Sequence, residues 1–342
     1  MRLLFTFDRK ACVRPEMTIS STRAQWRGAV ILLLAALIWG TTFVAQSVGM
    51  DSIGALTFNT IRTYMGAGGL LLVLLVRRLL YRSHTPGVLF APARNAADRP
   101  IDRRADRKTL LIGGVLIGVA HCIAGNLQQF AFNDTSAGKI ALITALYMFF
   151  VPLIGLFIGK RTPAATWACV VLGFVGLYFL SVDPAQPLKI NPGDFLALLC
   201  AFAFAVQILL IERFSPKADA IELSFLEFLV SGTLTAVLMF FFETPTASGI
   251  VAAMPSLLYA GVMSCGIAYT LQIVGQKYAE ATVASLMMCM EAPFGVVASA
   301  ILLHERLSER ETVGCVIMLA AIILSQIPFK ALTKRKLARS AR

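Results

Sequence analysis

The sequence predicts an all-α integral membrane protein, with ten transmembrane helices arranged as two inverted five-helix repeats. Hydrophobic residues make up 57% of the 342 residues and charged residues only 15%, a balance typical of a chain that crosses a membrane many times. Ten apolar segments alternate with polar or basic connections, and a pattern beginning with Leu-Gln at Leu127 recurs at Leu271. This internal similarity predicts the repeat.

The apolar segments are long enough, or nearly so, to cross a hydrocarbon core of about 30 Å at about 1.5 Å per residue. Several contain glycines, which let transmembrane helices approach one another closely. We expect the segments at residues 28–48, 54–76, 110–132, 137–158, 164–181, 192–212, 221–242, 255–275, 281–303 and 312–329.

The predicted domain boundaries follow from these segments. We expect a basic cytoplasmic tail at 1–27, a first repeat at 28–181, a second repeat at 192–329 and a basic cytoplasmic tail at 330–342. The connection 77–108 is rich in Arg and contains three prolines, so it is predicted to be a disordered cytoplasmic loop. Both Met1 and Met17 remain candidate starts of translation.

Basic residues are distributed unevenly between the two ends of the segments. Most of the 31 Lys and Arg fall in the tails, in the loop 77–108 and in the alternate short connections, and few fall at the opposite ends. The positive-inside rule then predicts cytoplasmic termini and a multi-pass protein of the inner (plasma) membrane. The net charge of +12 is explained by this topology, so the expected partner is the lipid bilayer and not a nucleic acid.

The two halves correspond at a constant offset. LQQFAFNDTSAGKIALITALYMFFVP, from Leu127, matches LQIVGQKYAEATVASLMMCMEAPFG, from Leu271, and this offset places Tyr147 opposite Glu291. A shorter match pairs Arg62 in FNTIRTYMGAG with LSFLEFLVSG of the second half. Each half has an odd number of segments, so the second half is inverted in the membrane. Transporters built in this way bind substrate near mid-depth, between the repeats.

Glu291 is the leading candidate for the site. A carboxylate at mid-depth costs roughly 2.5–3.5 kcal/mol on insertion scales, and Pro293 two residues later interrupts the helix. Three roles remain open for Glu291: substrate contact, carriage of a coupling proton, or bonding to backbone freed at the helix break. Tyr147 holds the matching position in the first half, and Pro152 is predicted to kink its segment as Pro293 does.

Other polar and aromatic residues inside the apolar segments share helix faces. Trp39 and Thr42 lie three residues apart, as do Tyr269 and Gln272, and such pairs face the same way on a helix. His121 is a candidate proton carrier or a hydrogen-bonding residue. The predicted substrate contacts are Glu291, Tyr147, His121, Gln128, Trp39, Tyr269 and Gln272.

Three further polar residues are given weaker or different roles. Gln207 is a weaker candidate for the cavity. Arg62 and Glu227 are assigned structural roles, and they are predicted not to pair because the inversion places them in opposite halves of the membrane.

The order of several motifs resembles the EamA-type branch of the drug/metabolite transporter superfamily. The resemblance runs from Trp26 to Pro328 through AALIWGTTFVAQ, LTFNTIRTYMGA, the two long repeat blocks and ILLHERLSE. It implies ten helices in two inverted repeats around a central cavity, and transport of small polar metabolites, often outward. The sequence departs from the family at LLHER, where His304 replaces glycine, and at IGKR, which lacks the usual glutamate.

The expected function is a secondary-active transporter, with export the expected direction, of a small polar metabolite, amino acid or drug-like molecule. The alternatives are an intramembrane enzyme or a non-transporting membrane subunit. GxxxxGK[ST], GxSxG and HExxH are absent, and the three His and seven Cys form no ligand cluster, so neither enzymatic activity nor a cofactor or metal site is expected. The proton is the candidate coupling ion, and a homodimer is left open.

Overall fold

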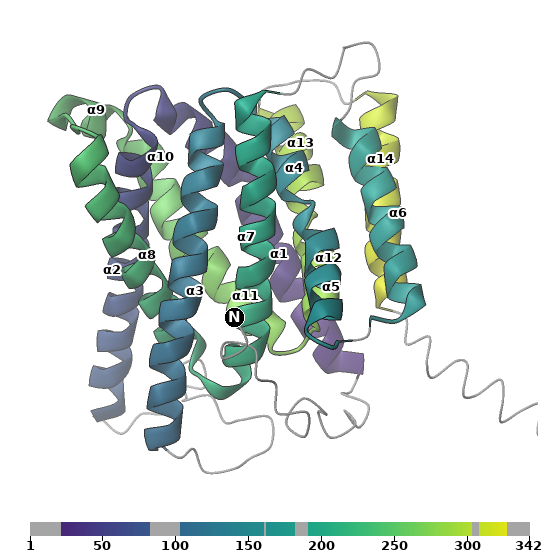
Figure 1. Cartoon of the computed structure of the whole chain (residues 1–342), viewed down its shortest axis with the longest axis horizontal. Helices are drawn as coiled ribbons and strands as arrows, with labels where there is room; N and C mark the ends of the chain where they lie inside the picture. Colours follow the sequence, from purple (N-terminus) through teal and green to yellow (C-terminus); the bar gives the residue numbers. More distant parts are fainter. Residues whose placement is uncertain (1–21, 83–102, 161, 182–190, 303–307, 327–342) are drawn as a thin grey trace, which may run out of the picture.

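The computed structural model describes residues 22–82, 103–160, 162–181, 191–302 and 308–326. The C-terminal tail, most of the N-terminal tail and the centre of the loop 77–108, which is predicted to be disordered, lie outside the described residues. The described elements are all helical (Figure 1). They are α1 (Thr22–Met50), α2 (Ala55–Arg82), α3 (Arg103–Ala131), α4 (Ala137–Thr144), α5 (Tyr147–Phe157), α6 (Ala164–Ser181), α7 (Pro192–Phe214), η1 (Ser215–Lys217), α8 (Ala220–Phe242), α9 (Ala247–Ala252), α10 (Met254–Leu258), η2 (Tyr259–Ala268), α11 (Tyr269–Gln276), α12 (Ala281–Met288), α13 (Glu291–Leu302) and α14 (Glu309–Ser325).

Seven stretches of the described chain are long and apolar enough to cross a membrane. They are Gln25–Met50, Ala55–Leu80, Arg107–Ala131, Ala137–Phe157, Pro192–Lys217, Ala220–Phe242 and Met254–Gln276. Shorter apolar helices occur at Ala164–Leu180 and Ala281–Val297. The predicted all-α membrane class is therefore confirmed, while the count of ten spans in inverted repeats stays a prediction.

The segments predicted at 137–158 and 281–303 are each two helices and not one. The breaks fall between α4 and α5 and between α12 and α13, before the prolines that were expected to cause a kink. At both breaks the backbone closes short i→i−3 bonds, such as Met148 N–H to Ala145 O and Ala292 N–H to Cys289 O. A proline cannot donate to the carbonyl four residues before it, and for Pro293 that carbonyl belongs to Cys289, at the break itself.

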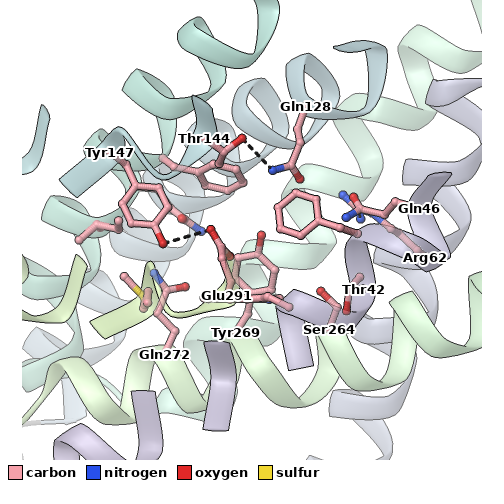
Figure 2. Close-up of a pocket in the computed structure, with 16 residues that line it drawn as sticks. Thr42, Gln46, Arg62, Gln128, Thr144, Tyr147, Ser264, Tyr269, Gln272 and Glu291 are labelled. Atoms are coloured by element: carbon pink, nitrogen blue, oxygen red, sulfur yellow. Dashed lines mark hydrogen bonds between the residues drawn. The ribbon is translucent and has the colours of Figure 1, made fainter. Parts of the chain in front are cut away.

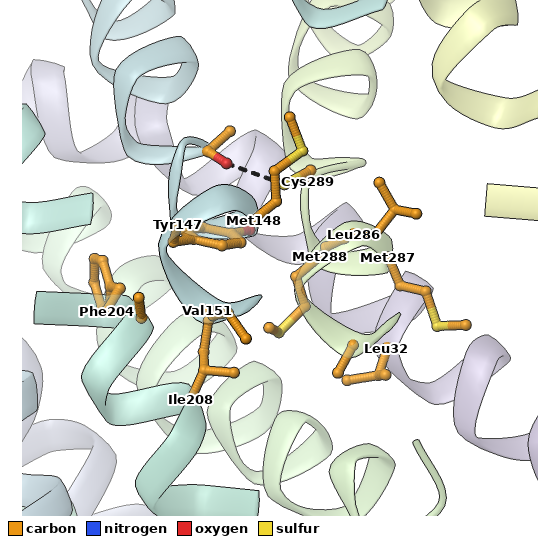
Figure 3. Packing of buried hydrophobic residues seen from close by; sticks show 14 of the residues in the cluster. Leu32, Tyr147, Met148, Val151, Phe204, Ile208, Leu286, Met287, Met288 and Cys289 are labelled. Carbon is orange, nitrogen blue, oxygen red and sulfur yellow. Dashed lines mark hydrogen bonds between the residues drawn. The ribbon is translucent and has the colours of Figure 1, made fainter. Parts of the chain in front are cut away.

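The two breaks face each other in the centre of the molecule. The Cys289 thiol donates to the carbonyl of Ala145 over 3.4 Å, and these residues are 144 positions apart. Around this contact, apolar side chains of both broken helices pack together, as Figure 3 shows for Met148, Leu286 and Met288. Both half-helices that follow the breaks therefore begin in the protein interior.

Helix α1 holds the second break in place through a glycine. A Cβ atom at Gly40 would lie 2.5 Å from the carbonyl oxygen of Glu291 and 2.8 Å from the Gly295 nitrogen. Only glycine allows two backbones to pack this closely. The start of α13, with Glu291, is thus seated directly on α1.

Helices α2 and α8 are joined near both ends. Arg77, near the C-terminal end of α2, contacts Asp219 at 2.9 Å and Glu222 at 3.1 Å. At the opposite end, the Glu243 carboxylate accepts hydrogen bonds from the backbone N–H groups of Leu56 (2.9 Å) and Thr57 (2.8 Å). An acidic group is stabilising at a helix N-terminus because the first N–H groups there lack helical partners. These contacts set the register of the two helices that carry Arg62 and Glu227.

Candidate functional site

A small cavity lies where the broken helices meet α1, α2, α3, α7 and α11 (Figure 2). The space open to the centre of a water-sized sphere is about 40 Å³, which is room for a few water molecules. Its lining is a mixture of aromatic rings, amides, hydroxyls and one group of each charge. The lining residues are Trp39, Thr42, Phe43, Gln46, Arg62, Gln128, Thr144, Tyr147, Phe204, Gln207, Ile208, Ser264, Tyr269, Gln272, Met288 and Glu291.

The first residues of α5 and α13 meet at the cavity. The Tyr147 hydroxyl donates to Glu291 Oε1 over 3.3 Å, across the same 144-residue offset. Both side chains are about 95% buried. The carboxylate lies in the first turn of α13, where the helix dipole favours negative charge. The break in each helix therefore places one polar group at the cavity, and the two groups bond to each other.

Arg62 supplies the positive charge from another part of the lining. Its Nη1 donates to Gln46 Oε1 over 2.5 Å, and its guanidinium lies 5.7 Å from the Phe58 ring centre. In Figure 2, Arg62 and Gln46 lie on the opposite side of the cavity from Tyr147. No ion pair joins Arg62 to Glu291 among the described residues. The cavity thus holds a basic and an acidic side chain that are not joined by direct contact.

Several polar atoms of the lining have no hydrogen-bond partner within the described chain. They are Trp39 Nε1, Arg62 Nε, Gln207 Oε1 and Gln272 Oε1. A buried polar group without a partner costs about 1–3 kcal/mol, so such groups are usually satisfied by water or by a ligand. A molecule bound at this cavity would need both donor and acceptor groups to satisfy them.

Six of the seven residues predicted as substrate contacts line this cavity: Glu291, Tyr147, Gln128, Trp39, Tyr269 and Gln272. His121 is the exception. Its ring packs edge-on against Tyr269, with the ring centres 4.7 Å apart, and it is not part of the lining. His121 therefore lies behind the lining, because it contacts Tyr269 and Gln207, which both line the cavity.

Arg62 was given a structural role from sequence, yet it lines the cavity. Its occurrence inside an apolar segment was the available signal, since intramembrane cations usually face a bundle interior. Gln46 was missed, although it lies four residues after Thr42 and so on the same face of α1. Glu227 was expected not to pair with Arg62, and among the described ion pairs it does not; its carboxylate instead accepts a hydrogen bond from Gln207.

Comparison with known proteins places the chain among membrane transporters. A model of the EamA-like transporter family matches residues 26–182 and 191–326. An uncharacterised transporter of Archaeoglobus fulgidus is 26% identical over 86% of this chain and 83% of its own length. The uncharacterised transporter YoaV of Bacillus subtilis is 21% identical over 87% of this chain and 96% of its own length.

A solved crystal structure of a protein has a similar fold. It superposes with a TM-score of 0.66 at 17% identity, over 91% of this chain and 98% of the other. At this level of identity the similarity shows a shared fold and nothing of the substrate.

Proposed function

Since the chain belongs to the EamA-like transporter family, we propose that it is a secondary-active transporter that exports a small polar molecule by alternating access through the cavity. The observation that carries this proposal is the meeting of two broken helices, offset by 144 residues, whose Tyr147 and Glu291 bond across the cavity. Broken helices that begin at mid-depth are the usual way in which transporters build a substrate site between repeats.

The charged residues of the cavity support a substrate that has an anionic or accepting group at one end and a cationic or donating group at the other. Arg62 would hold an anionic or accepting group beside Gln46, and Glu291 would hold a cationic or donating group beside Tyr147. Trp39 and Tyr269, whose ring centres are 4.8 Å apart, offer an apolar surface for the part between. Such a site selects by paired polar contacts, which discriminate more strongly than apolar contacts alone.

The small volume of the cavity supports a closed conformation as one state of the transport cycle. Room for a few water molecules is less than a metabolite needs, so α4 and α5 must move apart from α12 and α13 when substrate enters. In the inverted-repeat arrangement, exchanging the conformations of the two repeats opens first one side of the site and then the other.

The proposal is tested by untargeted metabolomics of cells and medium, comparing cells that overproduce the wild-type chain with cells that produce equal amounts of Glu291→Gln. We expect at least one small polar compound to accumulate in the medium and fall inside the cells only with the wild type. Identical metabolite profiles at equal membrane abundance would contradict export, and accumulation inside the cells would reverse the direction.

The topology is tested with single cysteines and a membrane-impermeant maleimide on intact cells. Thr244→Cys, just after α8, and Asp183→Cys should be labelled, whereas Arg103→Cys, at the start of α3, should be labelled only after lysis. The physical reason is the accumulation of Lys and Arg on the side that carries Arg103. The unsubstituted chain measures labelling of its native cysteines, and labelling of Arg103→Cys in intact cells would overturn the orientation.

Removal of the Tyr147 hydroxyl is expected to weaken transport. Tyr147→Phe keeps the ring in the core but leaves Glu291 Oε1 without its donor. A hydrogen bond to a charged group contributes about 1.5–3 kcal/mol, so we expect kcat/KM for transport to fall by about tenfold or more. Membrane abundance should stay near that of the wild type. If Tyr147→Phe fails to accumulate, the hydroxyl serves the fold and not transport.

A further inference from the structure

Behind the cavity wall, three polar side chains from three helices form a triangle of mutual contacts. Gln207 Nε2 lies 2.5 Å from Glu227 Oε1 and 3.3 Å from His121 Nδ1, and His121 Nδ1 lies 3.5 Å from Glu227 Oε1. Gln207 and Glu227 are 0% exposed and His121 is 1% exposed. The side chain of Gln207 is shared between this triangle and the cavity lining.

The triangle has two exclusive hydrogen-bonding states. If His121 Nδ1 carries no hydrogen, its lone pair accepts from the Gln207 amide. If Nδ1 carries a hydrogen, it donates to Glu227 Oε1 and cannot accept from Gln207. The position of a single proton therefore decides whether Gln207 is held by His121, and Gln207 is a residue that a substrate would touch.

Charged and titratable groups from several helices lie around this site. Arg62 of α2 approaches the imidazole, since a Cβ atom at Gly125 would lie 3.7 Å from both Arg62 Nη2 and His121 Nε2. Cys122, next to His121 on α3, turns its thiol to Thr235 at 3.5 Å. Tyr269 of α11 packs against the His121 ring, with the ring centres 4.7 Å apart. The second oxygen of Glu227, Oε2, has no partner within the described chain.

We propose that His121, Glu227 and Gln207 form a proton-binding site behind the wall of the cavity, and that this site carries the coupling ion of the transporter. A proton from water binds to His121 Nδ1, Nδ1–H then donates to Glu227 Oε1, and the Gln207 amide loses its bond to His121 and is held by Glu227 alone. Loss of the proton to the other side of the membrane restores the bond between Gln207 and His121. The coupling role rests on the proposed function, whereas the existence of the proton site does not.

This assignment separates two acids that lie in the same bundle. Glu291 faces the cavity and would meet the substrate, whereas Glu227 meets only protein. A binding acid and a proton-carrying acid at different positions allow substrate and proton to be bound at the same time. Binding of the proton and binding of the substrate are then coupled through Gln207, because Gln207 bonds to His121 only in the unprotonated state. Such a difference in contacts is what allows one ligand to shift the equilibrium of the other.

The test is infrared difference spectroscopy of the purified full-length chain in lipid nanodiscs, recorded between acidic and alkaline buffer, so that the proton itself is the probe. We expect a pH-dependent shift of a carboxylate band, caused by the hydrogen bond from Nδ1–H to Oε1, that is lost in Glu227→Gln and kept in the matched variant Glu291→Gln. His121→Asn, which leaves Glu227 in place, should move the pH midpoint of that band. A spectrum of folded Glu227→Gln that superposes on the wild type, or a midpoint unmoved by His121→Asn, would overturn the proton site.

Two further measurements complete this test. If Glu227→Gln does not fold, Glu227→Asp replaces it and must shift the frequency and midpoint of the band. The link to the cavity is read from the fluorescence of Trp39 in a Trp26→Phe and Trp167→Phe background, since Trp39 contacts Tyr269 and Tyr269 contacts His121. Its pH midpoint should coincide with that of the Glu227 band. A Trp39 signal that is silent at that pH would overturn the coupling while leaving the proton site standing.

Discussion

Glu291→Gln is expected to abolish both exchange and gradient-driven accumulation of the substrate in proteoliposomes, with membrane abundance close to that of the wild type. Glutamine keeps the size of the side chain and can still accept from Tyr147, but it removes the negative charge that faces the cavity. Truncating one partner of a buried charge pair costs about 2–5 kcal/mol. The proposed pair is Glu291 with a cationic group of the substrate, so transport should fall by about 30-fold or more. The measurement uses the compound identified by metabolomics.

Which activities Glu291→Gln loses distinguishes the three roles that the sequence left open for Glu291. A residue that binds substrate loses exchange and driven transport together and raises the apparent KM. A residue that carries only the coupling proton loses driven transport and keeps exchange, because exchange needs only alternation of access. A residue that only braces the break before Pro293 keeps both activities and lowers thermal stability. The control is Glu280→Gln, the same substitution at an exposed acid just before α12, which should transport normally.

Much of the fold could be predicted from the sequence because a membrane restricts which sequences and structures can cross it. Apolar length alone locates α1, α2 and α3, since lipid requires each crossing to satisfy its own backbone hydrogen bonds. The 144-residue correspondence placed Tyr147 opposite Glu291, and the structure brings the two side chains into contact. The breaks at Ala145 and Cys289 could not be located, because they depend on where two chain segments meet and not on the local pattern.

The predicted contacts agree with the cavity lining where a polar residue is isolated in an apolar segment and differ from it where depth within the bundle matters. His121 and Gln128 share a helix face by spacing, yet only Gln128 lines the cavity. The ring of Tyr269, contributed by α11, covers His121, and one-dimensional spacing carries no information about such a neighbour. Sequence spacing could not show that Arg62 borders the cavity, because its partner Gln46 lies on another helix and sets the direction of the guanidinium.

Gly40→Val is expected to be strongly destabilising and to abolish transport, because the space at Gly40 is occupied by backbone of α13. Its Cβ would lie 2.5 Å from the Glu291 oxygen, 2.8 Å from the Gly295 nitrogen and 3.1 Å from the Phe294 Cβ. Overpacking costs about 1–3 kcal/mol where side chains can adjust, and backbone cannot rotate away, so we expect a cost of about 3 kcal/mol or more. Relief of the clash would move the start of α13 and carry Glu291 away from Tyr147.

The matched control for this variant is Gly68→Val on α2, where a Cβ would meet no atom within 4 Å. Thermal unfolding of both purified variants in the same detergent should show a lowered transition for Gly40→Val and an unchanged one for Gly68→Val. Transport should follow the same order. Because Gly40 itself carries no polar group, loss of transport with near-normal stability would show that α1 positions Glu291 for substrate. Normal stability and transport in Gly40→Val would mean that α1 and α13 do not pack as closely as this structure shows.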